Sequence, residues 1–420
     1  MMVVLGFLGL LVLGVPVAFV LAMTAIIYVV VSGNFVLMDS YPQQFMGGLE
    51  NYGLLAMPLF ILVGELMNEG GIARRLMSMS MAMIGSMKGG LAYVNLISNM
   101  MMASILGSTV AQITIMTRMA VPEMERAGYK KDAAVALTAA GGLLAPIIPP
   151  SMLFVIFGVI AQISIGDLFI AGIVPGLLLG CAFLALIGWM ARRHDFPSND
   201  GLTLTERFVA VREGLAAGLV PFIIVGSILG GLATPTEAAA LACVGAILIG
   251  RFVYKEFFFD SFWPALQRTA RNSAMVLMMI AAAQVFGWVI TFENIPMITA
   301  QWIQSISQSP TVFILLVMAL LLVIGMVLDP IPALILVVPV LLPVAVDVYN
   351  INPYHFGVIV CLTLVMGLLT PPVGSALFTA SALSGVKAER IAILLAPYLG
   401  VMLLVLLLLA IVPALVTFMI

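Results

Sequence analysis

The stretch GLLAPIIPPSMLF (Gly142–Phe154) places three prolines within five residues in the middle of an apolar segment. Proline has no backbone N–H and clashes with the preceding helical turn, so it interrupts a helix. A second stretch, GLLTPPVGSALF (Gly367–Phe378), repeats this feature near the other end of the chain. Both stretches predict helices that stop part-way and leave carbonyl oxygens without helical hydrogen bonds.

The surrounding composition predicts an integral membrane protein. The chain has 420 residues, of which 63% are hydrophobic and 9% are charged, whereas soluble domains usually carry about 25% charged residues. Its apolar runs reach about 20 residues, the length that crosses a bilayer as a helix. At membrane depth, irregular backbone survives only where it is buried in protein or lines a wet cavity. Repeated breaks therefore favour a transporter over a passive anchor.

The basic residues predict the topology. Loops near 33–53, 161–167, 292–310 and 345–355 contain no Lys or Arg, so all 17 basic residues can be placed on one side. Under the positive-inside rule that side is cytoplasmic. The basic residues are Arg74, Arg75, Lys88, Arg118, Arg126, Lys130, Lys131, Arg192, Arg193, Arg207, Arg212, Arg251, Lys255, Arg268, Arg271, Lys387 and Arg390.

Two apolar runs predict hairpins, because the two flanks of each run are alike in carrying or lacking basic residues. The run 91–117 has basic residues at both ends, so both ends are expected in the cytoplasm, with a turn near Ser104–Thr109. The run 311–346 has no basic flank, so it is expected to enter from the opposite side and to turn near Val327–Ala333. Two hairpins from opposite faces are what an inverted repeat produces.

The proline stretches support the same repeat, because Thr138, Gly142 and Pro149–Pro150 recur in order as Thr363, Gly367 and Pro371–Pro372. We therefore predict an all-α polytopic membrane protein built from inverted-topology repeats, each with a re-entrant hairpin and a Pro-broken helix. The predicted repeats are 1–210 (hairpin 91–120, broken helix 131–162) and 211–420 (hairpin 311–346, broken helix 355–384).

The two breaks carry the predicted chemistry. Freed carbonyl oxygens suit a dehydrated sodium ion, as in the discontinuous helices of secondary transporters. Half-helices that start near Ser151 and Ser375 direct N–H groups and a positive dipole end to the same region, which suits an anion. The alternative is a pair of proline kinks without a ligand. Two related copies in opposite orientations favour binding.

Four motifs resemble the large membrane subunit of tripartite ATP-independent periplasmic (TRAP) transporters, and the resemblance covers essentially the whole chain. The motifs are AMPLFILVGELMNEGGIARRL (Ala56–Leu76), GGLLAPIIPPS (Gly141–Ser151), GGLATPTEAAALA (Gly230–Ala242) and GLLTPPVG (Gly367–Gly374). The resemblance implies sodium-driven uptake of an organic acid, such as a C4-dicarboxylate or sialic acid, across a bacterial inner membrane. It also implies two partners: a small membrane subunit and a periplasmic binding protein that delivers the substrate.

The family further implies an elevator mechanism, in which the hairpins and broken helices slide against a scaffold of the remaining helices, including those near 1–32 and 213–254. By the same resemblance, sodium lies between each hairpin tip and the facing broken helix, bound mostly by main-chain oxygens. Thr370 can add a hydroxyl that Ala145 lacks, so the two sites are not expected to be equivalent. The implied sodium residues are Ser104, Gly107, Gly142, Ala145 and Pro146 in the first set, and Gly325, Gly367, Thr370 and Val373 in the second.

Ser108, Thr109 and Ser151 are the candidates for substrate contact, and helix capping is the alternative for each. Asp329 is a further candidate, because a carboxylate at membrane depth is functional by default. It can bind substrate or a cation or carry a proton, or it can cap a helix that starts with Pro330.

Two other acidic residues have simpler interpretations. Glu65 is expected to pair with an arginine near Arg74–Arg75. Glu237, three residues after a threonine, fits a capping box.

Other functional classes are weaker. The chain has no Gly-x-Ser-x-Gly or His-Glu-x-x-His motif and no Cys/His pairing, so neither an enzyme nor an organic cofactor is expected. Nothing indicates nucleic acid, and the lipid bilayer is the expected surrounding. A stand-alone sodium–anion symporter or ion antiporter with inverted repeats is the main alternative. It would transport without a binding protein or a small subunit.

Overall fold

The computed structural model describes the chain except residues 1, 85–88, 194–195, 198–203 and 258, so the predicted role of Lys88 in the topology lies outside the described residues. Every regular element in the described part is a helix. Eight of these helices are long and apolar enough to cross a membrane. The prediction of an all-α polytopic membrane protein is confirmed.

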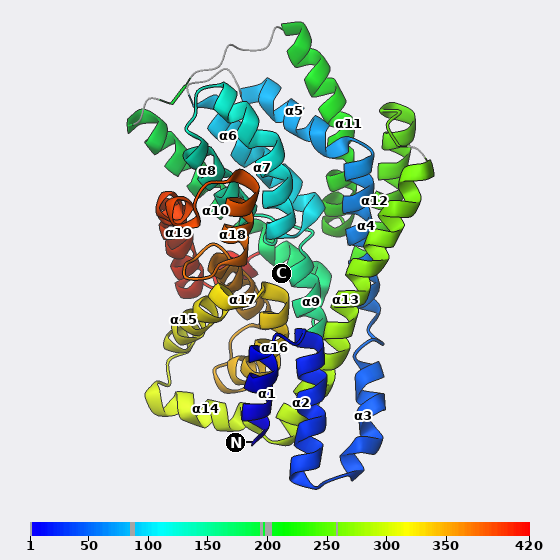
Figure 1. Cartoon of the computed structure of the whole chain (residues 1–420), viewed down its shortest axis with the longest axis vertical. Helices are drawn as coiled ribbons and strands as arrows, with labels where there is room; N and C mark the ends of the chain where they lie inside the picture. The colour runs from blue at the N-terminus through cyan, green and yellow to red at the C-terminus, as the bar shows by residue number, and fades with distance from the viewer. Residues whose placement is uncertain (1, 85–88, 194–195, 198–203, 258) are drawn as a thin grey trace.

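One set of helices, which we call the outer group, lies along one side of the molecule (Figure 1). Its members pack mainly on one another, with α5 against α11, α12 against α4, and α13 against α2 and α4. The outer group comprises α1 (Met2–Val12), α2 (Val17–Ser32), α3 (Val36–Gly47), η1 (Tyr52–Leu55), α4 (Ala56–Glu69), α5 (Ile72–Ile84), α11 (Leu204–Leu229), α12 (Pro235–Leu248), η2 (Ile249–Val253) and α13 (Phe259–Phe292).

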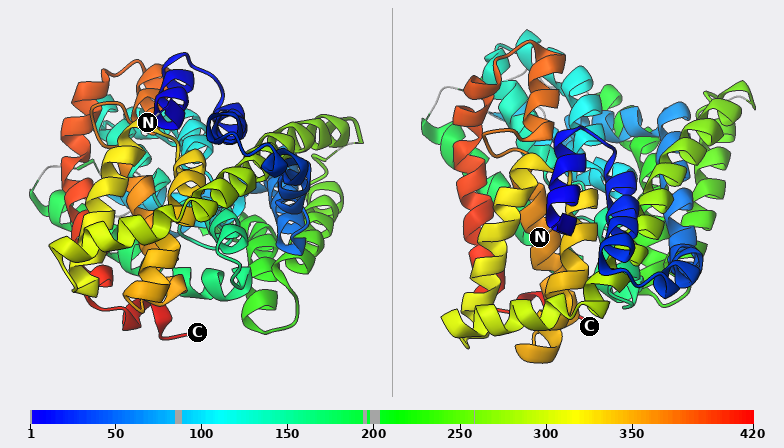
Figure 2. Two further views of the ribbon diagram at one scale, coloured as in Figure 1. Left: turned by 90° about the horizontal axis from the view of Figure 1, so that it is seen from below. Right: turned by 60° about the horizontal axis from the view of Figure 1, so that its bottom comes forward.

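The second set, the hairpin group, lies on the other side and packs around α8 and α17. Figure 2 shows α14 (Ile295–Ile306) running beneath this group from the end of α13 to the start of α15. The hairpin group comprises α6 (Gly90–Leu106), α7 (Thr109–Arg126), α8 (Lys131–Gly142), α9 (Met152–Ile160), α10 (Ile165–Arg193), α15 (Pro310–Val327), α16 (Pro330–Pro343), η3 (Val344–Val348), α17 (Pro353–Gly367), α18 (Ser375–Ser384), α19 (Ala388–Ile411) and α20 (Ala414–Thr417).

Helices α10 and α19 lie outside the predicted hairpins and breaks. Both pack within the hairpin group: α10 contacts α19 and α17, and α19 contacts α8. Arg390, at the start of α19, donates to Asp132 at the start of α8 over 2.8 Å. The helices near 1–32 and 213–254 do lie in the outer group.

Both predicted interruptions are present. Helix α8 ends at Gly142 and α9 begins at Met152, whereas α17 ends at Gly367 and α18 begins at Ser375. In each break the Pro-Pro bond is cis. The turns between paired helices are short: Gly107–Ser108 joins α6 to α7, and Leu328–Asp329 joins α15 to α16.

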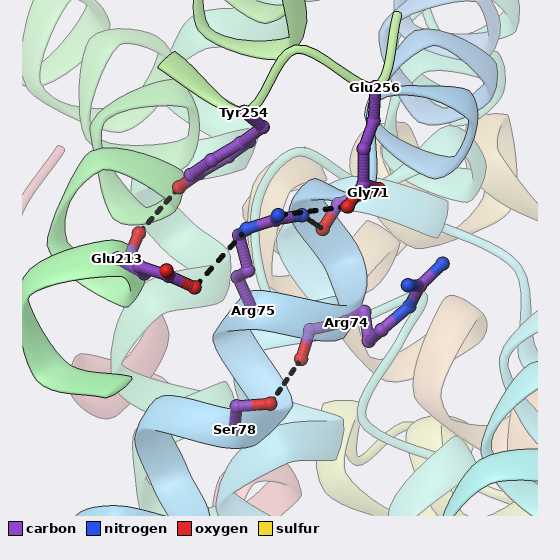
Figure 3. A network of polar contacts seen from close by, with 7 residues as sticks. All are labelled: Gly71, Arg74, Arg75, Ser78, Glu213, Tyr254 and Glu256. Atoms are coloured by element: carbon purple, nitrogen blue, oxygen red, sulfur yellow. Dashed lines mark hydrogen bonds and ion pairs between the residues drawn. The ribbon is translucent and has the colours of Figure 1, made fainter. Parts of the chain in front are cut away.

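A polar network fixes the corner between α4 and α5 (Figure 3). Arg75 donates to Gly71 O over 3.1 Å and to Glu256 Oε1 over 2.9 Å, and its Nε lies 3.5 Å from Glu213 Oε2. The guanidinium also lies 4.0 Å from the centroid of the Tyr254 ring, a cation–π contact. One side chain of α5 thus joins α11 and the α12–α13 connection, all within the outer group.

Candidate functional site

A cavity of about 700 Å³ lies where the two groups meet. Both hairpin tips reach it, through Gly107–Ala111 and Asp329–Pro332. The breaks contribute Pro146 and Leu368, and the outer group closes the opposite wall with α4 and α13. The sequence elements that carry the predicted chemistry therefore surround one space.

The first hairpin tip packs closely on the first break. Gly107 has φ +57°, and a Cβ there would lie 3.3 Å from Met152 N and 3.4 Å from Pro150 O. Ala145 is fully buried, and no described residue donates a hydrogen bond to its carbonyl oxygen. A buried carbonyl without a partner is costly. The first break therefore presents the kind of acceptor that a bound cation would satisfy.

A buried amide network supports the same break, and sequence reasoning missed it. Gln112 of α7 donates to Asn99 Oδ1 over 2.9 Å and lies 3.4 Å from Gly141 O. Asn95 of α6 donates to Thr138 Oγ1 of α8 over 2.7 Å. These amides and Thr138 are at most 1% exposed. Amides in an apolar hairpin were the available signal, because buried polar groups need partners.

The second hairpin approaches its break backbone to backbone. A Cβ on Gly367 would lie 2.5 Å from Gly325 C and 2.7 Å from Gly325 Cα. Gly374 donates to Met326 O over 2.9 Å, which ties the tip of α15 to the break. No described residue donates to the carbonyl oxygen of Thr370, which is the counterpart of Ala145. The Thr370 hydroxyl donates to Met366 O over 2.8 Å and keeps its acceptor capacity.

Asp329 occupies the N-cap position of α16, and Pro330 follows at N1. Its side chain makes no capping hydrogen bond. Instead, Asp329 Oδ1 accepts from the hydroxyl of Ser375, at the start of α18, over 2.8 Å. The carboxylate is exposed and lines the cavity. The residue therefore joins the second tip to the second break rather than capping its own helix.

The three hydroxyl candidates for substrate contact fall into two groups, two residues that line the cavity and one that caps a helix. Ser108 and Thr109 line the cavity, Ser108 makes no capping bond, and the buried hydroxyl of Thr109 has no partner. Ser151 is a cap, since its Oγ accepts from Phe154 N over 3.3 Å and donates to Pro146 O over 2.5 Å. Its hydroxyl is thus already used within the break.

The predicted residues fall into two sets. Those that line the cavity are Gly107, Ser108, Thr109, Pro146 and Asp329. Those that are not among the lining residues are Ser104, Gly142, Ala145, Ser151, Gly325, Gly367, Thr370 and Val373. Within the second set, Ser104 donates to Met101 O over 2.7 Å, and Val373 is 41% exposed.

The ion pair that Glu65 forms on the outer wall of the cavity differs from the predicted one. Glu65 lines the cavity, and it pairs with Arg268 of α13 over 2.7 Å rather than with Arg74 or Arg75. Arg268 also contacts Glu69 over 2.5 Å. The predicted partner was wrong because the fold brings α13 beside α4. Glu237 forms the predicted capping box with Thr234.

Two solved structures share this fold. The YdaH transporter of Alcanivorax borkumensis matches with a TM-score of 0.65 and 15% identity, over 91% of this chain and 89% of that one. MtrF of Neisseria gonorrhoeae matches with a TM-score of 0.64 and 11% identity, over 91% and 84%. At these identities the likeness concerns the fold alone. The fold defines an all-α polytopic membrane protein.

Sequence comparison narrows the class. The family described as "Tripartite ATP-independent periplasmic transporter, DctM component" matches residues 4–415. The chain is 35% identical to the sialic acid TRAP transporter large permease protein SiaM of Vibrio cholerae, over 97% of this chain and 95% of that protein. It is 37% identical to the 2,3-diketo-L-gulonate TRAP transporter large permease protein YiaN of Escherichia coli, over 83% and 81%.

A third relative is the C4-dicarboxylate TRAP transporter large permease protein DctM of Pseudomonas aeruginosa, at 35% identity over 87% of this chain and 85% of that protein. The chain therefore belongs to the DctM component family of TRAP transporters and is a transporter permease subunit, not an enzyme. This membership favours the TRAP reading over a stand-alone symporter or antiporter.

Proposed function

We propose that this subunit couples uptake of an organic acid to sodium entry. The observation that supports the proposal is the pair of carbonyl oxygens at Ala145 and Thr370, which occupy equivalent positions in the two breaks and receive no hydrogen bond from the described residues. Unwound carbonyls at the midplane are the usual sodium ligands of transporters with discontinuous helices. The relatives named for organic acids support the substrate class.

The residues of each break fit a sodium ion. Its ligands would be the main-chain oxygens at Ala145 in the first break and at Thr370 in the second, where the Thr370 hydroxyl adds a further oxygen. The ion would supply positive charge close to the substrate carboxylate. That charge matters because no Lys, Arg or His is among the described residues that line the cavity.

The two groups of helices suit an elevator mechanism. In this proposal the hairpin group carries substrate and sodium, while the outer group stays fixed and the polar network around Arg75 holds its corner. The cavity lies at the boundary that would slide. A small membrane subunit and a periplasmic binding protein would complete the transporter in a bacterial inner membrane, in keeping with membership of the tripartite periplasmic transporter family.

Counterflow in proteoliposomes tests the proposal. The chain is reconstituted with and without the small subunit and binding protein of its own transporter, and exchange of radiolabelled organic acids is measured in sodium or choline buffer. Saturable exchange that requires sodium and both partners is expected. Sodium-dependent exchange by the chain alone would favour a stand-alone symporter, and exchange that ignores sodium would contradict the coupling.

A further inference from the structure

The two hairpins differ in what fills their interiors. The first hairpin contains three carboxamide side chains, Asn95, Asn99 and Gln112, each at most 1% exposed. The second, residues 310–343, contains neither asparagine nor glutamine. Burying a carboxamide among apolar groups costs free energy unless it is hydrogen-bonded. Because the second hairpin folds without any such group, the fold of a hairpin does not account for the amides of the first.

The three amides form a relay whose two ends both lie on α8. Asn95 donates to Thr138 Oγ1 over 2.7 Å, and Asn95 Oδ1 accepts from Asn99 Nδ2 over 2.7 Å. Asn99 Oδ1 then accepts from Gln112 Nε2 over 2.9 Å, and the same Nε2 lies 3.4 Å from Gly141 O. The relay therefore bridges the last turn of α8, from Thr138 to Gly141, with side chains from α6 and α7.

The last turn of α8 leads directly into the first break. Gly141 O accepts from Leu144 N over 3.1 Å, and Gly142 O accepts from Ala145 N over 3.3 Å, which is the tighter 3₁₀ spacing. A Cβ on Gly141 would lie 2.6 Å from both Cγ and Nδ2 of Asn99, so glycine lets the relay reach the backbone here. The carbonyl of Ala145, which receives no hydrogen bond from the described residues, closes this turn. Its direction therefore depends on how the turn is held.

Gln112 is the member of the relay that joins α7 to this turn. Its Nε2 has three acceptors within reach, namely Asn99 O at 2.8 Å, Asn99 Oδ1 and Gly141 O. Its buried Oε1, in contrast, has no partner among the described residues. A leucine would fill the position without an unpartnered oxygen, which is costly in an apolar interior. Stability alone therefore does not account for the glutamine, and its amide nitrogen is the part that acts on the break.

From this geometry we infer that Gln112 and Asn99 are positioning residues for the first proposed sodium site. They hold the last turn of α8, and through it they direct the Ala145 carbonyl toward the ion, just as the partners of metal ligands orient those ligands in other proteins. Neither residue lines the cavity, so the role is separate from substrate contact. The inference rests on the proposed sodium coupling and goes beyond it, because it makes the first site depend on hairpin amides and the second site independent of them.

Hydrogen–deuterium exchange of the full-length protein in detergent tests the inference, because it reports on each break separately. Sodium chloride is titrated at constant ionic strength against choline chloride, and protection is measured in peptides that cover residues 141–154 and 367–378. Gln112→Leu should raise the sodium concentration for half-maximal protection of the first break about fivefold, the equivalent of one hydrogen bond. The sodium concentration for half-maximal protection of the second break should keep its wild-type value.

The inverted repeat supplies a matched pair of variants. Thr138→Val and Thr363→Val each remove a buried hydroxyl that donates to the carbonyl four residues earlier, over 2.8 Å and 2.7 Å. Among the contacts of the described residues, only Thr138 also accepts from an amide of the relay. Thr138→Val should therefore raise the sodium requirement of the first break, as Gln112→Leu does, whereas Thr363→Val should leave both breaks at their wild-type values. The pair also tests the inference if Gln112→Leu fails to fold.

The outcomes separate a positioning role from structural support and from failure of the proposed function. If Gln112→Leu and Thr138→Val lower Tm but leave the sodium requirement unchanged, or raise it equally in both breaks, the relay only holds the hairpin together and the inference is overturned. Protection of wild type by sodium that is confined to the second break would also overturn it. Sodium coupling would stand in these cases. Wild-type protein without sodium-dependent protection of either break would contradict the proposed function, and the inference with it.

Discussion

Replacing Gly367 by alanine should force α15 and α17 apart. The added Cβ would lie 2.5 Å from Gly325 C and 2.7 Å from Gly325 Cα, whereas two carbons pack best at about 3.5–4.0 Å. The helices must therefore separate by about 1 Å at this crossing. Because both contacts are with backbone atoms, no side-chain rotation can relieve them.

The same displacement would reach the second break. The hydrogen bond from Gly374 N to Met326 O, now 2.9 Å, lies one residue beyond Gly325, and a shift of about 1 Å would place it outside hydrogen-bonding range. Overpacking costs about 1–3 kcal/mol, which corresponds to a fall of roughly 2–6 °C in apparent Tm. Sodium should also stabilise the variant less than it stabilises wild type.

Intrinsic-fluorescence melting of the detergent-purified protein measures both effects. Gly400→Ala is the matched control, because Gly400 lies inside α19 and an added Cβ there meets nothing within 4 Å. It should melt at or slightly above the wild-type temperature, since alanine favours a helix over glycine. A Gly367→Ala protein that melts like wild type, with unchanged stabilisation by sodium, would refute the reasoning.

Three further predictions concern single side chains. Thr370→Val removes the only side-chain oxygen proposed for the second site, so sodium-dependent counterflow should need several-fold more sodium; an unchanged requirement would count against that ligand. Arg75→Met leaves Glu213 and Glu256 without their partner and should lower the free energy of unfolding by about 1–3 kcal/mol, seen as a lower Tm. The control Arg74→Met, at an exposed residue, should have little effect on Tm. An equal fall in Tm for the two variants would contradict a stabilising role of the Arg75 network. The hydrogen bond from Arg75 lowers the pKa of Glu256 from its ordinary 4.5. The ionised Glu256 side chain therefore contributes to the stability of the fold above pH 4.5, and this contribution is lost as the pH falls through the lower folded-state pKa. The Tm difference between wild type and Glu256→Gln should shrink in that pH range, and a Tm difference that does not depend on pH would contradict the prediction.

The main breaks and turns of the fold could be predicted from local sequence. Proline clusters interrupt helices by a local mechanism, so the ends of α8 and α17 followed from residues 142–150 and 367–372. Basic residues on both flanks of the first hairpin, and their absence from both flanks of the second, located the turns at Gly107 and Asp329 to within a few residues, because charge placement relative to the bilayer is also a local property.

Partners distant in sequence could not be predicted. Glu65 meets Arg268 and Asp329 meets Ser375 only because tertiary packing brings separate helices together. The capping interpretation of Asp329 failed for the same reason: Ser375 supplies a hydrogen bond to its carboxylate that no local pattern reveals. Membership of α10 in the hairpin group likewise depends on which apolar face each neighbouring helix presents.

The most direct test of the central claim is a high-resolution cryo-EM comparison of the transporter in sodium and in choline. We predict an ion density beside the carbonyl oxygen of Ala145 and another beside that of Thr370, both present in sodium and lost in choline. Maps without density at either carbonyl in sodium, or with continuous helices through the two proline clusters, would contradict the account.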